Sequence, residues 1–293
     1  MLNRILKTAS AAIAALFLSS CGGGGTSGLN IYVTDAPVDL ASSIVLSFSK
    51  VVLNGPNVPK PQTIAFNPVS SLNVFQLQGG LSGALAVQVP IATGHYTDLK
   101  ITLAANSLSA QSSITLPDGT HILYIPNSQS DIVDVPVDFK FVSGQTVNLM
   151  LDFDMRKSIV QDPSDPTKYI LIPSVRAILS DESGSIVGRV DPSLITCTTP
   201  AVYVYSGKVS TPTDVDSNAP AGTLQPLATA LVGLNSTSGE YDFTSAFLPA
   251  GTYTVAFTCQ ASQDVANQAD NIAFTAMTTA VVTAKNSTLV ALP

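Results

Sequence analysis

The chain has 293 residues, of which 45% are hydrophobic and 11% charged, and its formal net charge is −7. This length allows one large domain or two ordinary ones, and a charged fraction far below the usual quarter favours an exported β-protein over a cytosolic enzyme. Lys and Arg are too sparse to form phosphate-binding clusters, which excludes nucleic acid as a partner and direct adsorption to anionic lipid.

The first 20 residues predict a secretory signal peptide. Arg4 and Lys7 precede an apolar run over residues 9–18, and a cationic head before a short apolar core is typical of export signals. The run is about half of the roughly 20 residues that span a bilayer. A membrane-spanning helix is therefore not expected here.

Residues 18–21, Leu-Ser-Ser-Cys, resemble the bacterial lipobox, in which the signal is cut before a cysteine that becomes diacylated. The resemblance implies that Cys21 carries fatty acyl chains such as palmitate and anchors the protein in a lipid bilayer. Gly22 stands where an Asp would retain a lipoprotein at the inner membrane, which favours the outer membrane. An ordinary export signal with an unmodified Cys21 is the alternative. The Gly-rich residues 21–28 predict a flexible tether.

Alternating apolar residues predict β-strands through the rest of the chain. Over residues 44–48 the apolar side chains alternate with polar or smaller ones, and the pattern shifts by one residue at Lys50 before it resumes at Val51 and Leu53. One extra residue there predicts either a β-bulge or the point at which the strand leaves the covered part of the sheet. Residues 99–103 and 147–153 alternate in the same way, as expected of strands with one buried face.

Two segments share a turn pattern that places a Gly two positions before a Tyr. They are residues 90–97, Pro-Ile-Ala-Thr-Gly-His-Tyr-Thr, and residues 249–254, Pro-Ala-Gly-Thr-Tyr-Thr. The Tyr supplies a large apolar body and a hydroxyl that can bond back to the backbone. The pattern resembles a corner of immunoglobulin-like and transthyretin-like sandwiches. We therefore predict an all-β fold with two such β-sandwiches in tandem after the signal peptide.

A polar stretch at residues 181–184, Asp-Glu-Ser-Gly, predicts a domain boundary. We expect one sandwich over residues 29–182 and a second over residues 183–293. Once Cys21 takes lipid, Cys197 and Cys259 remain as a pair in an oxidising compartment. We predict that both face inward from strands and form a disulfide worth about 4 kcal/mol. Two buried free thiols are the alternative.

Residues 29 to about 180 resemble the domain-of-unknown-function family numbered 4382, found in exported proteins of bacteria and archaea. The segments that carry the resemblance are residues 31–37, 49–53, 94–100, 151–154 and 172–175. At Lys100 the family pattern would have Arg. The family has no established activity, so the resemblance implies a β-fold without a mechanism.

Residues 184–293 resemble carboxypeptidase-regulatory or transthyretin-like modules, on segments 184–190, 241–243 and 248–253. Such modules are generally accessory and non-catalytic. The cysteine pair is not part of their general pattern.

Histidine, the commonest general base and metal ligand, occurs only at His95 and His121. No His-x-x-x-His or Cys-x-x-Cys spacing is present, which argues against zinc, and no Gly-x-Ser-x-Gly segment is present either. We interpret both histidines as solvated loop residues. No catalytic residue, metal ligand or cofactor is assigned.

Asp35, Asp152 and Asp154 form the one weak candidate binding cluster. Asp152 and Asp154 lie two residues apart and share one face of a strand, where with Asp35 they could bind Ca²⁺ or act as the paired acids of a glycan hydrolase. The chain has no Trp for a sugar cleft. The favoured interpretation is that both acids pair with Arg156, Lys157 or Arg176.

These observations predict a membrane-anchored lipoprotein that acts as a non-catalytic binding or scaffold module at the cell envelope. Its partner would be an envelope protein or a glycan. The alternatives are a carboxylate-based glycan hydrolase and a structural envelope or pilus-like subunit, and an exposed apolar sheet edge would favour the last of these.

Overall fold

The computed structural model describes residues 28–36, 41–108, 110–126 and 129–293. Cys21, the predicted signal peptide and nearly all of the predicted tether lie outside the described residues. Gly28, assigned to the tether from the sequence, is instead the first residue of a strand. No helix in the described part of the chain has the length and apolar character that spanning a membrane requires.

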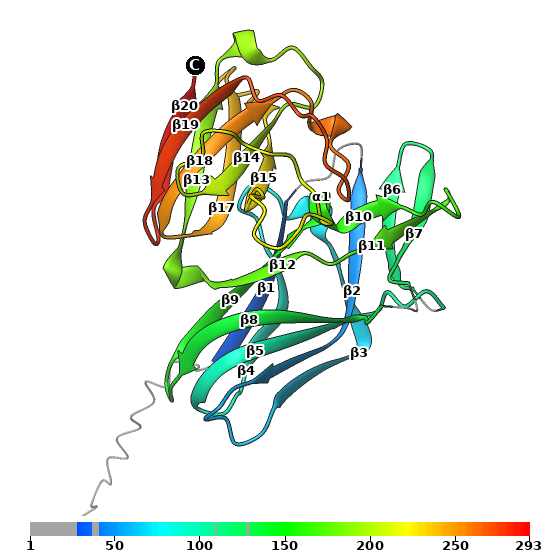
Figure 1. The fold of residues 1–293 in the computed structure, drawn as a ribbon. Helices are drawn as coiled ribbons and strands as arrows, with labels where there is room; N and C mark the ends of the chain where they lie inside the picture. Colours follow the sequence, from blue (N-terminus) through cyan, green and yellow to red (C-terminus); the bar gives the residue numbers. More distant parts are fainter. Residues whose placement is uncertain (1–27, 37–40, 109, 127–128) are drawn as a thin grey trace, which may run out of the picture.

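Residues 28–179 form two facing sheets, which we call the first half (Figure 1). The smaller sheet has the strand order β12 (Val175–Leu179), β9 (Thr146–Asp154), β1 (Gly28–Ala36) and β4 (Gly83–Val89). The larger sheet runs β10 (Ile159–Gln161), β11 (Lys168–Leu171), β7 (Gly119–Tyr124), β6 (Ser112–Leu116), β2 (Ser43–Asn54), β5 (Gly94–Leu103) and β8 (Ile132–Phe141), with β3 (Gln62–Asn73) also paired to β2. A 3-10 turn, η1 (Val74–Gln76), and a single-turn helix, α1 (Met155–Ser158), interrupt the strands.

The core of the first half lies between these two sheets. The apolar faces predicted for β2, β5 and β9 are buried there, and they include Ile44, Leu46, Phe48 and Leu99, none of which is exposed. The register of β2 against both neighbours shifts between Phe48 and Lys50, which confirms the predicted bulge.

Strand β1 is central in the smaller sheet because it pairs with β4 on one side and runs parallel to β9 on the other. The parallel register is unbroken from Gly28, beside Thr146, to Ala36, beside Asp154. Parallel neighbours end at the same edge of a sheet. The carboxyl end of β1, with Asp35, therefore lies beside the carboxyl end of β9.

Residues 183–292 form a second sandwich of two four-stranded sheets, which we call the second half. One sheet has the order β16 (Gly233–Leu234), β17 (Tyr241–Pro249), β13 (Ser183–Val190) and β20 (Ser287–Leu292). The other runs β15 (Ala228–Leu231), β14 (Ala201–Ser206), β18 (Gly251–Thr258) and β19 (Ala276–Val282). Short 3-10 turns are η2 (Ser180–Glu182), η3 (Pro192–Leu194) and η4 (Ala261–Gln263). No described strand of one half pairs with a strand of the other, and the predicted all-β class is confirmed.

Strand β14 is buried on both faces. Val202 and Val204 point into the sandwich, whereas Tyr203 and Tyr205 belong to a second apolar cluster on the outer side of the sheet. All four are fully buried. Loop residues such as Val215 and Phe274 pack over the outer face, so the rings of the two tyrosines are buried there.

The two Gly-x-Tyr segments form matching corners. The Tyr96 hydroxyl donates to the carbonyl oxygen of Ala92 at 2.6 Å, and the Tyr253 hydroxyl donates to that of Pro249 at 2.7 Å. Each bond spans four residues and ties the start of a strand, β5 or β18, to the turn before it. The predicted bond from the hydroxyl back to the backbone is confirmed in both.

Candidate functional site

Basic side chains from the first half reach backbone carbonyls of the second half. Arg156, only 6% exposed, donates from Nη1 to the carbonyl oxygen of Ala261 at 2.9 Å, and its guanidinium lies 5.8 Å from the ring centre of Tyr203. Lys157, next along α1, donates from Nζ to the carbonyl oxygen of Pro226. Charged donors make stronger hydrogen bonds than neutral ones, so these contacts hold the two halves together.

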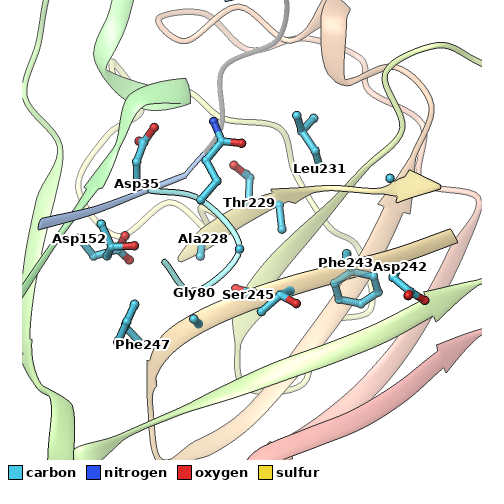
Figure 2. Close-up of a pocket in the computed structure, with 17 residues that line it drawn as sticks. Asp35, Gly80, Asp152, Ala228, Thr229, Leu231, Asp242, Phe243, Ser245 and Phe247 are labelled. Atoms are coloured by element: carbon cyan, nitrogen blue, oxygen red, sulfur yellow. The ribbon is translucent and has the colours of Figure 1, made fainter. Parts of the chain in front are cut away.

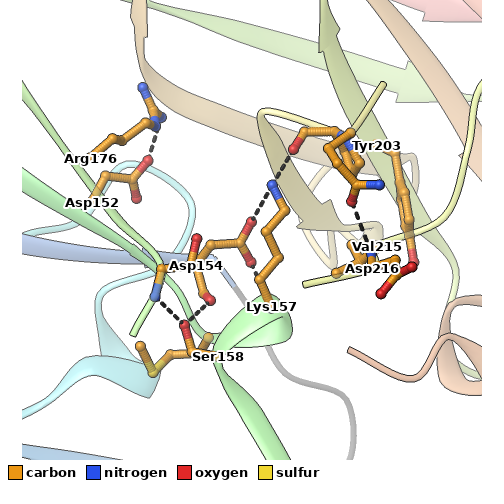
Figure 3. A network of polar contacts seen from close by, with 12 residues as sticks. Asp152, Asp154, Lys157, Ser158, Arg176, Tyr203, Val215 and Asp216 are labelled. Atoms are coloured by element: carbon orange, nitrogen blue, oxygen red, sulfur yellow. Dashed lines mark hydrogen bonds and ion pairs between the residues drawn. The ribbon is translucent and has the colours of Figure 1, made fainter. Parts of the chain in front are cut away.

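A third contact between the halves is made by Arg176, which is paired with Asp152. Asp152 is the cross-strand neighbour of Arg176 in the pairing of β9 with β12, and the two side chains form an ion pair. From the other end of its guanidinium, Arg176 donates to the carbonyl oxygen of Phe247 at 2.7 Å. Burial raises the pKa of Asp152, and the nearby Arg176 charge offsets this only in part. Figure 3 shows the pair beside the Lys157 network.

Asp154 holds the next basic side chain in place. Its Oδ1 accepts from the backbone N–H of Lys157 at 3.2 Å and so caps helix α1, as an Asp at the first position of a helix commonly does. Its Oδ2 lies 3.4 Å from Lys157 Nζ. Asp152 and Asp154 therefore pair with Arg176 and Lys157, as the favoured interpretation of the sequence expects.

Asp35, the third acid of the predicted cluster, is 6% exposed and accepts from the backbone N–H of Met155 at 3.3 Å. The structure brings all three acids to one end of β1 and β9. Among the described residues, however, the group whose carboxylate oxygens lie close enough together to hold one ion is a different one, in the loops of the second half.

That group is Asp214, Asp264 and Asp270, with one oxygen of each within 4.8 Å of the others. Burial raises the pKa of Asp264 to about 6, although Tyr203 donates to its carboxylate. Backbone N–H groups also donate to the carboxylates, including that of Val265 to Asp270 at 2.7 Å. Because a protein donor already serves at least one oxygen of each carboxylate, we assign no ion to them. The sequence did not predict this group, because β14 and β18 are antiparallel and the loops that carry these acids leave the two strands at opposite edges of the sheet.

A cavity of about 340 Å³ lies between the two halves, and we call it the junction cavity (Figure 2). The first half contributes the end of β1, Asp152 of β9 and a loop at Gln78, Gly79 and Gly80; the second half contributes β15, β16 and β17. Figure 2 shows Asp35 and Asp152 on one side of it and Asp242, Phe243 and Ser245 on the other.

Local geometry explains how the loop reaches this place. The Thr34 hydroxyl lies 2.9 Å from the carbonyl oxygens of both Leu77 and Leu81, which fixes the intervening loop to the end of β1. Gly79 and Gly80 adopt φ values of 65° and 91°, a region that favours glycine because it lacks a Cβ.

Buried polar side chains in the cavity wall lack hydrogen-bond partners. Thr229 is 3% exposed and Ser245 is 4% exposed, and neither hydroxyl has a partner among the described residues. Among the same residues, Gln78 Nε2 has no hydrogen-bond partner either, and Asp242 Oδ1 has only an ion-pair contact, 4.0 Å from Arg189 Nε. Native proteins leave few such groups without hydrogen bonds, so their concentration around one cavity marks it as a candidate binding site. Sequence analysis missed it because its residues come from distant segments.

Both histidines lie on strands, which corrects their interpretation as loop residues. His95, on β5, lies 2.6 Å from Asp138 Oδ1, and His121, on β7, lies 2.9 Å from Asp118 Oδ1. His121 is held more closely because its Nδ1 also donates to the carbonyl oxygen of Thr167 at 3.0 Å. Neither histidine lines the junction cavity.

Cys197 and Cys259 form a disulfide with a Cα–Cα distance of 5.5 Å, as predicted. Cys259 directly follows β18, Cys197 lies in the loop after η3, and both are half-buried. The prediction that both cysteines face inward from strands is therefore wrong, although Cys259 packs against the core of the second half. The bond ties this loop to the end of a core strand.

Comparisons with known proteins add a family but no activity. No curated protein matches the chain in sequence. Among solved structures, the chain aligns with the minor pilin GBS52 of Streptococcus agalactiae at 8% identity and a TM-score of 0.21, covering 90% of this chain and 94% of the pilin. It also aligns with a candidate adhesin of Bacteroides ovatus at 8% identity and a TM-score of 0.20, covering 92% and 88%. TM-scores this low support no argument about function.

The family model described as "Domain of unknown function (DUF4382)" matches residues 26–173, about half of the chain. The match covers all of β1 to β11 and therefore the strands that carry Asp35, Asp152 and Asp154. The chain belongs to the DUF4382 family.

Proposed function

We propose that this chain is a lipoprotein of the bacterial envelope whose two halves are β-sandwich domains and together form a non-catalytic binding module. Acylated Cys21 anchors it, and Gly22 directs it to the outer membrane. The observation that carries the binding role is the junction cavity, with unpaired polar side chains such as Thr229 and Ser245 buried in its wall. Such a cavity at a domain junction is a common location for a ligand.

The arrangement of the acids supports binding over catalysis. A hydrolase would need a carboxylate free to exchange a proton with its substrate. Instead, Asp152 is tied to Arg176, and Asp154 caps α1 and contacts Lys157. Both acids hold basic side chains at the junction, which is a structural use.

Mass spectrometry of the mature amino terminus tests the anchor. The proposal expects a chain that begins at Cys21 with fatty acyl groups attached, and a Cys21→Ala variant that is lost from the membrane fraction. An unmodified Cys21 on protein recovered from culture fluid contradicts the anchor.

Site-specific photo-cross-linking in native envelopes tests the binding role. Gly233 lines the cavity, and a side chain added there meets no atom within 4 Å, so a photoreactive residue fits at this position. Lys60 is exposed and does not line the cavity, which makes it a matched control. Capture of envelope material at Gly233 and not at Lys60 is expected. Equal capture at both positions contradicts a role for the cavity.

A structural envelope subunit is the second candidate. It is favoured by exposed apolar side chains on the edge strands β19 and β20, where Met277, Val281 and Leu289 are 45%, 60% and 71% exposed. The occupant of this edge would be a second copy of the chain. Sedimentation that is independent of concentration would rule this candidate out, whereas self-association abolished by Val281→Lys would support it.

A further inference from the structure

We propose that the junction cavity binds one neutral sugar residue, so that the ligand of this module is a glycan. This inference rests on the proposed binding function and adds the chemical class of the ligand. It is carried by the unpaired groups of the cavity wall, by the charges around the cavity and by its size.

The unpaired groups match hydroxyls in number and kind. Thr229 and Ser245 can each donate and accept, Gln78 Nε2 can only donate, and Asp242 Oδ1 can only accept. Sugar hydroxyls both donate and accept, so they can bond to each of these kinds of group. A serine or threonine hydroxyl moves between staggered positions about χ1, so a ligand that offers a bond can draw it from the wall toward the cavity.

The charged residues around the cavity disfavour an anionic ligand and do not require a cationic one. No Lys, Arg or His is among the described residues that line the cavity, whereas three aspartates are. An anionic ligand would face these carboxylates, whereas the cations that pair with two of them, Arg176 and Arg189, do not line the cavity. Asp152 is already paired with Arg176, and Asp242 accepts from Asn235 Nδ2 at 2.9 Å. A neutral ligand with hydroxyl donors therefore fits best, because carboxylates are strong acceptors.

The size of the cavity fits one sugar ring. Its volume of about 340 Å³ is near the lower end of the range of ligand pockets. Phe247 lines it and adopts a φ of 53°, which is left-handed backbone that a Phe rarely adopts. Strain of this kind persists where the surrounding structure enforces it and is concentrated at binding sites. The same residue accepts the hydrogen bond from Arg176, so the junction contact also positions an aromatic ring at the cavity.

Two conservative variants separate binding from folding. Thr229→Val and Ser245→Ala remove hydroxyls that have no partner, so the free protein should be unchanged or more stable in each. Thr102→Val is the matched control, since the Thr102 hydroxyl is also buried without a partner but lies on β5 and does not line the cavity. Each full-length chain is titrated by calorimetry and by saturation-transfer NMR with neutral hexoses, N-acetylhexosamines and their disaccharides. Glucose 6-phosphate and glucosamine serve as anionic and cationic probes.

The proposal expects at least one neutral sugar to bind wild type and the Thr102 variant equally. Loss of one hydrogen bond predicts an affinity about tenfold weaker for the Thr229 and Ser245 variants. It is overturned if no neutral sugar binds at millimolar concentration, if the charged probes bind more tightly, or if the two variants bind as wild type does. A crystal structure soaked in the sugars that shows only ordered water on both hydroxyls also overturns it.

Failure of this proposal is distinguishable from failure of the proposed function. If neutral sugars do not bind but the photoreactive residue at Gly233 still captures envelope material, the binding role stands and the ligand is not a sugar. If both experiments fail, neither the ligand class nor the binding role holds.

Discussion

Asp152 and Arg176 are ion-paired cross-strand neighbours on β9 and β12, and the same guanidinium donates to a carbonyl oxygen of the other half. The pair is mostly shielded from solvent, with side-chain exposures of 12% and 21%. A residue pair inside one sheet thus forms part of the contact between the two sandwiches. The stability of the whole molecule should depend on it.

Replacing Arg176 with Met should lower the free energy of unfolding by about 3 kcal/mol, because it leaves the Asp152 carboxylate buried without its partner. Denaturant titration measures this change. Adding Asp152→Asn to the same chain should recover part of the loss. The exposed pair of Lys285 and Asp181, 3.1 Å apart, is the control, and Lys285→Met should cost less than about 1 kcal/mol. Equal effects of the two single variants would contradict the role assigned to Arg176.

His121 should titrate above the usual histidine range. Hydrogen bonds to Asp118 and to the carbonyl oxygen of Thr167 raise its pKa, since both ring nitrogens can donate only in the imidazolium form. A raised pKa stabilises the fold below the unfolded value of about 6.5, and this contribution is lost as the pH rises through the folded pKa. NMR titration of the ring protons measures the value. Asp118→Asn should lower it, and an unchanged value would contradict the assignment.

Asp264 should make the fold less stable as the pH rises from about 4 to 7. Its pKa is raised by burial to about 6, against about 3.9 in an unfolded chain. The folded state therefore holds the proton more tightly. The stability that this proton contributes below the pKa of the unfolded chain is lost as the pH rises through the pKa of the folded state. Denaturation measured across this range should show a shallower slope for Asp264→Asn, and an identical slope would refute the prediction.

Reduction of the Cys197–Cys259 bond should cost about 4 kcal/mol, because it opens a loop with a sequence separation of 62 residues. Urea denaturation with and without reductant measures the difference. Replacing both cysteines with Ala should give the same loss and remove the sensitivity to reductant. A reductant effect that persists in the double variant would point to another cause.

Local periodicity was sufficient to predict strands, the bulge at Lys50 and the bonds of Tyr96 and Tyr253, because each depends on residues near in sequence. The burial of both faces of β14 could not be predicted in this way, since the loops that cover Tyr203 and Tyr205 come from elsewhere in the chain. Patterns in one segment do not specify which distant loop covers it.

The candidate site was predictable only in part. The strand alternation placed Asp152 and Asp154 on one face. Their observed partners, Arg176 and Lys157, were among the three basic residues that the sequence suggested. Thr229 and Ser245 gave no signal, because a small polar residue in a strand is usually solvated. Each pairs with a fully buried residue of a neighbouring strand, Tyr203 for Thr229 and Ile186 for Ser245, and no local pattern encodes this pairing.

Strand β1, in its parallel register with β9, runs from the start of the first half toward the junction cavity. The strand starts at Gly28 and reaches the junction at Asp35, and seven steps of about 3.3 Å span roughly 23 Å. A chain tethered through its amino terminus therefore presents the cavity well away from the point of attachment. With the anchor proposed at Cys21, the length of β1 would separate the cavity from the lipid head groups, where envelope polymers would reach it.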